Sequence, residues 1–132
     1  MASLFLKNRS KKNALIICLK GDLGSGKTTF LQGFAKGLGI KERILSPTFV
    51  IMKRFKIKDL RYKSKNFFHI DCYKIKKPKD LLDIGFKKNV FSPENIVAVE
   101  WPEKIKKIFP KNTIWLIFEF IDEKTRKIII KK

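Results

Sequence analysis

A glycine-rich stretch, GDLGSGKTTF at residues 21–30, holds the residue types that bind phosphate. The pattern G-x-x-x-x-G-K-[ST], in which main-chain amides surround the terminal phosphates of a nucleotide, is met at Gly21, Gly26, Lys27 and Thr28. Glycines leave no Cβ between amide and phosphate oxygen, the lysine pairs with the β- and γ-phosphates, and the threonine hydroxyl can ligate Mg²⁺. The remaining nucleotide-binding positions predicted here are Asp22, Leu23, Gly24, Ser25 and Thr29.

Two carboxylates could complete a magnesium site beside this loop. Asp71 ends the apolar stretch NFFHID, and Glu100 ends the apolar stretch NIVAVE. A carboxylate at the end of a strand is ordinary by itself, but a pair of them in a chain with a phosphate loop indicates a metal site. Because magnesium keeps several water and phosphate ligands, either residue could bind the ion directly while the other acts through water or orients an attacking water. The sequence does not rank the two.

The elements around these residues are typical of an α/β domain. The run ALIICL (14–19) is apolar without alternation, which predicts a strand covered on both faces. After the loop, apolar residues at helical spacing predict a helix over 27–38 that stops at Gly39. We expect Gly33 and Gly37 to let this helix pack closely on the sheet.

Later segments predict further strands and short helices. Two hairpins are expected, one from 46–57 with 66–71 and one from 113–120 with 125–131. Short helices are expected over 77–86 and after Pro102. The predicted fold is a single P-loop NTPase-like α/β domain over residues 1–132, with a partly parallel central sheet, an antiparallel edge and flanking helices.

The composition sets limits on location and partners. The net charge is +19, from 31 lysines and arginines against 12 acidic residues, and only five of the 31 are arginine. This excess reflects a general drift towards lysine, either alone or together with real binding of RNA or an acidic partner. No apolar run reaches the roughly 18 residues that span a membrane, and the apolar run at the N-terminus is too short for the core of a signal peptide. A cytoplasmic protein is therefore expected. Both cysteines, Cys18 and Cys72, lie in apolar stretches and are expected to be reduced and buried.

Four motifs, GDLGSGKTTF, SPTF, HIDCY and VEWPE, resemble in their order and spacing the TsaE (YjeE-type) ATPases, from about residue 14 to the C-terminus. Those proteins support the bacterial synthesis of tRNA threonylcarbamoyladenosine. The resemblance implies weak, partner-stimulated hydrolysis of ATP with Mg²⁺. It also implies TsaD-type and TsaB-type partner subunits whose complex is reset by that hydrolysis, with tRNA contacted weakly or indirectly.

The resemblance also implies roles for single residues. Thr48, in SPTF, would lie in a switch-like segment near the γ-phosphate, and Trp101 would lie close to the nucleotide. Asp71 would be the Walker-B-like carboxylate and Glu100 a magnesium ligand, both acting with Lys27 in catalysis.

The chain departs from the family pattern at two places. Lys74 stands where the family has arginine, and the segment before the first strand is short, which affects contacts to the base. Arg126 is expected to compensate on the base or phosphate side. His69 is expected to be a packed strand residue rather than a catalyst.

Two other classes of function remain open. A P-loop kinase of a nucleoside or small metabolite would need an acceptor pocket and a lid, and residues 53–65 are too short and too rich in lysine for a good lid. A nucleic-acid-binding module without catalysis would explain the charge but not the phosphate loop or its carboxylates.

Overall fold

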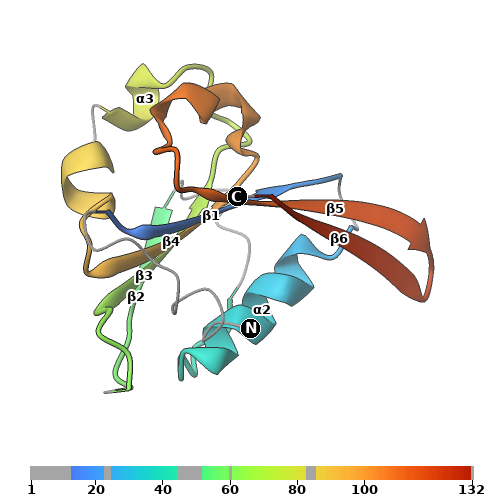
Figure 1. The fold of residues 1–132 in the computed structure, drawn as a ribbon, viewed down its shortest axis with the longest axis horizontal. Coiled ribbons are helices and arrows are strands. Elements are labelled where there is room, and N and C mark those ends of the chain that lie inside the picture. Colours follow the sequence, from blue (N-terminus) through green and yellow to red (C-terminus); the bar gives the residue numbers. More distant parts are fainter. Residues whose placement is uncertain (1–12, 23–24, 45–51, 60, 83–85, 132) are drawn as a thin grey trace.

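A six-stranded sheet forms the centre of the protein in the computed structural model, which describes residues 13–22, 25–44, 52–59, 61–82 and 86–131 (Figure 1). The strands are β1 (Leu15–Lys20), β2 (Met52–Lys56), β3 (Asn66–Asp71), β4 (Asn95–Glu100), β5 (Ile114–Asp122) and β6 (Thr125–Lys131). The helices are α2 (Lys27–Gly37) and α3 (Lys79–Leu82), with a π-helical turn η1 (Phe86–Val90) and a 3₁₀ segment η2 (Pro102–Ile108).

The strand order is β2-β3-β4-β1-β5-β6. Strand β1 runs parallel to both of its neighbours, β4 and β5, and β3 runs parallel to β4. Antiparallel partners close the sheet at both ends, β2 against β3 and β6 against β5. The predicted α/β class and both predicted hairpins are therefore confirmed, and an antiparallel strand lies at each edge rather than at one.

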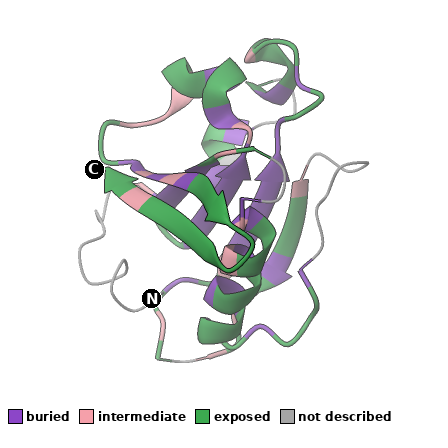
Figure 2. Ribbon diagram, turned by 90° about the vertical axis from the view of Figure 1, so that its right-hand side faces the viewer, coloured by how far each residue is buried: buried purple, intermediate pink, exposed green. Residues whose placement is uncertain are grey.

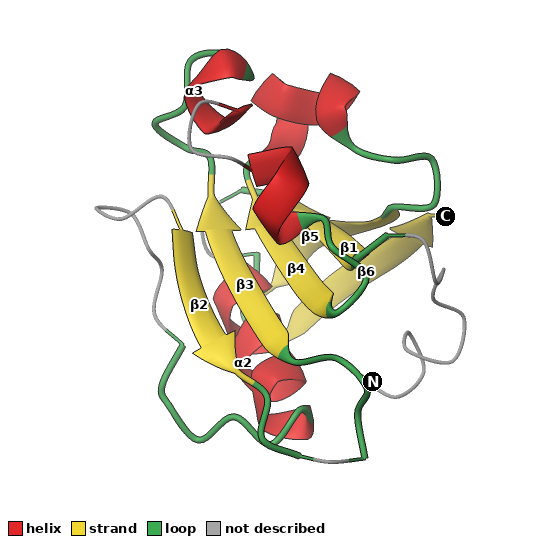
Figure 3. Cartoon of the chain, turned by 90° about the vertical axis from the view of Figure 1, so that its left-hand side faces the viewer, coloured by secondary structure: helices red, strands yellow, loops and turns green. Residues whose placement is uncertain are grey.

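Helix α2 covers one face of the sheet, and the short helical segments lie over the other (Figure 3). Strand β1 divides its side chains between them: Leu15, Ile17 and Leu19 pack with α2, whereas Ile16 and Cys18 pack on the opposite side. This two-sided burial explains why the strand is apolar without alternation. The central strands are buried, while the distal part of the β5–β6 hairpin is exposed (Figure 2).

Both cysteines are buried and unbridged, as expected. Burial raises the pKa of the Cys18 thiol, and nearby Cys72 and Glu103 raise it further. Burial likewise raises the pKa of Cys72 to about 12, with the charge of Asp71 acting in the same direction. Both thiols therefore stay protonated at neutral pH.

Helix α2 ends in a glycine-based cap. Gly39 has φ +79°, its amide donates to the carbonyl of Lys36, and the amide of Ile40 donates to the carbonyl of Ala35, each at 3.0 Å. This pair of bonds is the Schellman arrangement, which satisfies carbonyls that the last helical turn leaves without partners. The expected close packing of Gly33 is wrong, because this residue is exposed and a Cβ on it would meet nothing within 4 Å.

The other helical segments differ from the expected helices or are described only in part. Of the helix expected over 77–86, the structure describes the turn α3, where the amide of Leu82 donates to the carbonyl of Pro78 at 3.1 Å, and residues 83–85 lie outside the described residues. The helix expected after Pro102 is a 3₁₀ segment, with non-helical φ and ψ at Ile105. Of the strand expected over 46–57, only Met52–Lys56 lies in a described strand.

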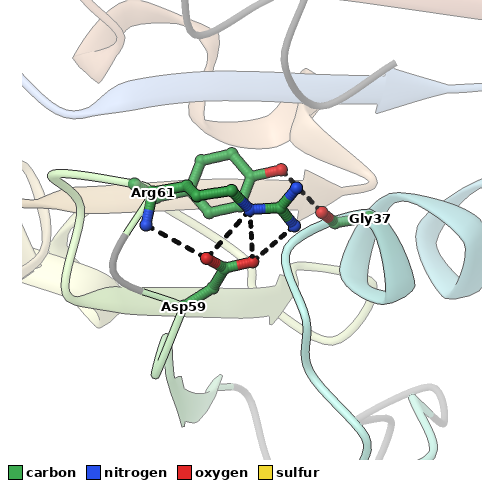
Figure 4. Close-up of polar contacts among 4 residues, drawn as sticks. Gly37, Asp59 and Arg61 are labelled. Carbon is green, nitrogen blue, oxygen red and sulfur yellow. Dashed lines mark hydrogen bonds and ion pairs between the residues drawn. The ribbon is translucent and has the colours of Figure 1, made fainter.

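The segment between β2 and β3 is fastened to the end of α2 (Figure 4). The Tyr62 hydroxyl donates to the carbonyl of Gly37 at 2.7 Å. Next to it, the Arg61 guanidinium pairs with the Asp59 carboxylate, with Nη2 2.6 Å from Oδ2, and these hydrogen bonds lower the pKa of Asp59. Asp59 also contacts the position that a Cβ on Gly39 would take, at 3.4 Å.

Gly39→Ala should therefore destabilise the protein, because an alanine in the left-handed region costs about 1–2 kcal/mol. The matched substitution Gly33→Ala should instead stabilise the protein by about 0.5–1 kcal/mol, since helical φ suits alanine and its methyl group meets open space. Urea unfolding followed by circular dichroism gives both values. A Gly39→Ala variant as stable as the wild type would contradict the capping role.

Candidate nucleotide-binding site

The carboxyl ends of the parallel strands bring the predicted residues together. Parallel strands end at the same edge of a sheet, where α/β proteins bind their ligands. A pocket of about 790 Å³ opens there. Its lining comes from the start of α2, the ends of β3 and β4, and the β5–β6 hairpin, namely Ser25, Gly26, Lys27, Thr28, Thr29, Phe30, Asp71, Tyr73, Glu100, Trp101, Phe118, Glu123, Lys124, Arg126 and Ile128.

The glycines of the loop are required by close approach and by backbone conformation. A Cβ on Gly21 would lie 2.8 Å from the Phe118 carbonyl oxygen and 2.8 Å from Ser25 Oγ, so no larger residue fits there. Gly26, directly before α2, has φ +102°, which side chains other than glycine rarely adopt. The loop therefore presents bare backbone at the N-terminus of an 11-residue helix, which is a favourable place for an anion.

Ser25 supplies a further sign that the loop is built for a ligand. Its hydroxyl is buried and has no hydrogen-bond partner among the described residues. A buried polar group without a partner is costly, and a phosphate oxygen is a partner of the right chemistry. Thr28 and Thr29 follow at the start of α2, where both are exposed and line the pocket.

Lys27 is a buried charge of the pocket. Its side chain is buried, with 5% of the residue exposed. Its ammonium donates to the Gly21 carbonyl at 2.5 Å and lies 3.9 Å from the centre of the Trp101 ring. Burial lowers the pKa of Lys27, while the negative charges of Glu100, Glu103, Asp71 and Asp22 oppose that shift.

Asp71 and Glu100 lie side by side because β3 and β4 are parallel and in register at this pair. Both are buried, at 7% and 4% exposure, and both line the pocket. Asp71 Oδ1 accepts the amide of Tyr73 at 2.9 Å, and Glu100 Oε2 lies 2.6 Å from His69 Nε2. Strand β4 is the direct neighbour of β1, so Glu100 is the carboxylate one strand away from the phosphate loop.

Trp101 has an unusual backbone. Its φ of 54° and ψ of 53° are left-handed, and it is the only non-glycine residue with positive φ in the described ranges. Such a conformation costs on the order of 1–3 kcal/mol and is found mainly at functional sites. The turn leads from β4 into Pro102 with the ring against the Lys27 ammonium and 5.3 Å from the ring of Tyr73.

The β5–β6 hairpin forms a wall of the pocket that the sequence analysis largely missed. Phe118 and Ile128 are register partners, and both line the pocket. Arg126, the one residue of this wall that was predicted, reaches Gly26: a Cβ on that glycine would lie 3.6 Å from Arg126 Cγ. The Arg126 guanidinium donates to the carbonyls of Asp122 and Thr125 and lies 4.4 Å from the Phe120 ring centre. The pairing of 113–120 with 125–131 was the signal that could have identified this wall.

The predicted residues thus divide into three groups. Those brought to one pocket are Ser25, Gly26, Lys27, Thr28, Thr29, Asp71, Glu100, Trp101 and Arg126. Gly21 and Asp22 lie just beside it, since the Gly21 carbonyl accepts from Lys27 and Asp22 is exposed in the loop. Leu23, Gly24 and Thr48 fall outside the described residues.

The described residues fit a nucleotide with magnesium. The loop has the open backbone and the unpartnered hydroxyl that phosphate requires. A hydroxyl from Thr28 and carboxylates from Asp71 and Glu100 line the same pocket, and magnesium prefers such oxygen ligands.

Comparisons with known proteins show the family to which the chain belongs. The model of the family "Threonylcarbamoyl adenosine biosynthesis protein TsaE" matches residues 2–128. The tRNA threonylcarbamoyladenosine biosynthesis protein TsaE of Haemophilus influenzae is 31% identical over 122 residues, covering 92% of this chain and 73% of the relative. The protein of the same name from Rickettsia typhi is 33% identical over 132 residues, covering 99% and 85% respectively.

A solved structure shows the same fold. The crystal structure of YdiB from Bacillus subtilis aligns with a TM-score of 0.67 and 26% sequence identity, over 96% of this chain and 72% of that one. Among the residues that the structure describes, no helix is long and apolar enough to cross a membrane. On the strength of the family match and of relatives more than 30% identical over most of its length, the chain belongs to the TsaE family of threonylcarbamoyladenosine biosynthesis proteins.

Proposed function

We propose that this chain is a small cytoplasmic ATPase that acts as an accessory subunit in the N6-threonylcarbamoyladenosine modification of tRNA. One observation carries the proposal. A buried lysine, an open-backbone loop and two in-register carboxylates share one pocket, and this set of groups suits a nucleotide bound with magnesium. Membership of the TsaE family connects that pocket to the modification.

The nucleotide would be bound mainly by its phosphates. The loop amides and the N-terminus of α2 would surround them, and the Lys27 ammonium would pair with the β- and γ-phosphates. Thr28, Glu100 and Asp71 would hold the magnesium ion. When bound, magnesium neutralises charge on the phosphate oxygens. Trp101 and the hairpin wall with Arg126 would contact the rest of the nucleotide.

Nucleotide binding would exchange the partners of Lys27. Its ammonium is held by a neutral carbonyl and an aromatic ring. A phosphate offers a charged acceptor, and such charge-assisted bonds are roughly twice as strong as neutral ones. The γ-phosphate would draw the ammonium towards itself and change the surroundings of the Trp101 ring.

Hydrolysis would rest on positioning and electrostatics, with one of the carboxylates orienting the attacking water. Arg126 is the only described arginine that lines the pocket, and its guanidinium is bonded to hairpin carbonyls. An arginine placed on the transition state is worth about 10³–10⁵ in rate, so turnover by the isolated chain should be slow. TsaD-type and TsaB-type partners would stimulate it, and hydrolysis would reset their complex, with the segment containing Thr48 as the switch.

Phosphate release measured with ATP and Mg²⁺ alone, with partner subunits added, and with tRNA or a candidate acceptor added tests the proposed function. We expect slow release with ATP and Mg²⁺ alone, and faster release when TsaD-type and TsaB-type subunits are added. Transfer of phosphate to a nucleoside or metabolite would instead identify a kinase. Salt-sensitive tRNA binding without any nucleotide binding would identify an RNA-binding module.

Lys27→Met should abolish ATP binding without destabilising the nucleotide-free protein. Burial lowers the pKa of Lys27, so the charged form is disfavoured by folding, and removing the charge should keep or raise the melting temperature. The melting temperature of the wild type should rise towards that of the variant as pH rises through this lowered pKa. The folded state then releases the proton of Lys27 before the unfolded state does, so the cost of burying the charge disappears. Calorimetric titration with ATP and thermal melts between pH 7 and 10 give both results.

The exposed Lys36 on the same helix provides the matched control, and Lys36→Met should bind ATP like the wild type. Unaltered ATP affinity in Lys27→Met would rule out the phosphate role of this lysine.

Trp101 should report nucleotide binding by its fluorescence. The Lys27 ammonium lies 3.9 Å from the ring centre, so withdrawing it changes the field at the indole. The chain has two tryptophans, and Trp115→Phe leaves Trp101 as the single emitter. We expect its emission to change with a midpoint equal to the calorimetric dissociation constant. Constant emission at saturating nucleotide would show that Lys27 stays on the ring.

A further inference from the structure

His69 has a contact that the proposed function does not use. It lies two residues before Asp71 on β3, so both side chains point to the same face of the sheet. Its register partner on β4 is Ala98, two residues before Glu100. Because Ala98 has only a methyl group, the imidazole has room to extend along β4 towards the Glu100 carboxylate.

The contact between the two side chains is short and buried. His69 Nε2 lies 2.6 Å from Glu100 Oε2, and the side chains are 1% and 5% exposed. A carboxylate accepts, so the ring nitrogen at this contact donates. His69 Nδ1 is buried and has no hydrogen-bond partner among the described residues, so the bond to Glu100 is the polar contact that the structure shows for this ring.

This bond restricts what Glu100 can do. The imidazole holds the Oε2 atom of Glu100, and because Glu100 lines the pocket, its other oxygen, Oε1, is left for a ligand there. Glu100 also attracts the nearby Lys27 ammonium, as its effect on the pKa of that lysine shows. A carboxylate without a second support could turn to pair with the lysine and would then be lost to a metal ion.

We propose that His69 is a positioning residue that holds Glu100 Oε2 so that Oε1 remains directed at the magnesium ion. This inference rests on the proposed function, in which Glu100 is a magnesium ligand. His69 is not among the residues that line the pocket, so it would act on the ion only through Glu100. Partners of this kind typically change metal affinity by about 10–100-fold when removed.

The test compares two amide substitutions of different reach. In His69→Gln the side-chain amide can donate from nearly the position of Nε2, whereas in His69→Asn the amide is one methylene shorter and cannot reach Glu100. Mn²⁺ affinity is measured by electron paramagnetic resonance with saturating ADP. Metal-free ADP affinity is measured by calorimetry in the presence of a chelator.

We expect His69→Asn to weaken Mn²⁺ binding by about 10–100-fold and His69→Gln to remain close to the wild type. Metal-free ADP affinity should not change in either variant. In a Glu100→Gln background, His69→Asn should have little further effect, because the histidine acts through that carboxylate.

Two results would overturn the inference. One is wild-type Mn²⁺ affinity in His69→Asn when Glu100→Gln is weakened. The other is equal weakening in His69→Asn and His69→Gln, which would show that the ring volume matters rather than the hydrogen bond. Failure of the proposed function looks different: the wild type would not bind ADP, or Glu100→Gln would bind Mn²⁺ as the wild type does.

Discussion

A buried ammonium at the start of α2 is the constraint around which the site is organised. Removing Lys27 from water disfavours its charge, and the protein offsets this with carboxylates at the ends of β3 and β4. Those carboxylates can surround the lysine only because the strands are parallel and in register, so that they end at one edge. The left-handed backbone of Trp101 adds an aromatic face at the cost of local strain. The strand register and the strained backbone of Trp101 therefore both place groups that stabilise the charge of Lys27.

The sequence predicted those parts of the site that depend on local pattern. The phosphate loop, the helix from 27 and the terminal carboxylates each follow from a short run of residue types. The two-sided burial of β1 also followed, since an apolar strand without alternation must be covered twice. Local pattern thus identified the main pocket residues. It did not rank Asp71 and Glu100, because both end a strand in the same way.

Features that depend on contacts between distant segments could not be predicted in this way. The bond between His69 and Glu100 joins residues 31 positions apart and needs the register of β3 on β4. The hairpin that carries Phe118 and Ile128 was predicted, but its place beside the phosphate loop follows from the pairing of β5 with β1, which the sequence did not show. Gly33 was misjudged because close packing was expected from its lack of a side chain, although helical spacing turns it away from the buried face formed by Leu31 and Phe34. The short 3₁₀ and π segments arise from local packing that periodicity does not encode.

The two thiols described with the core have a practical consequence for studying the protein. Alkylating and spin-labelling reagents attack thiolates at the surface, and both native cysteines are buried and protonated at neutral pH. A single cysteine introduced at an exposed position can therefore be labelled selectively while Cys18 and Cys72 are left in place. Site-directed probes on the exposed hairpin would then follow motion at the pocket in an otherwise native chain.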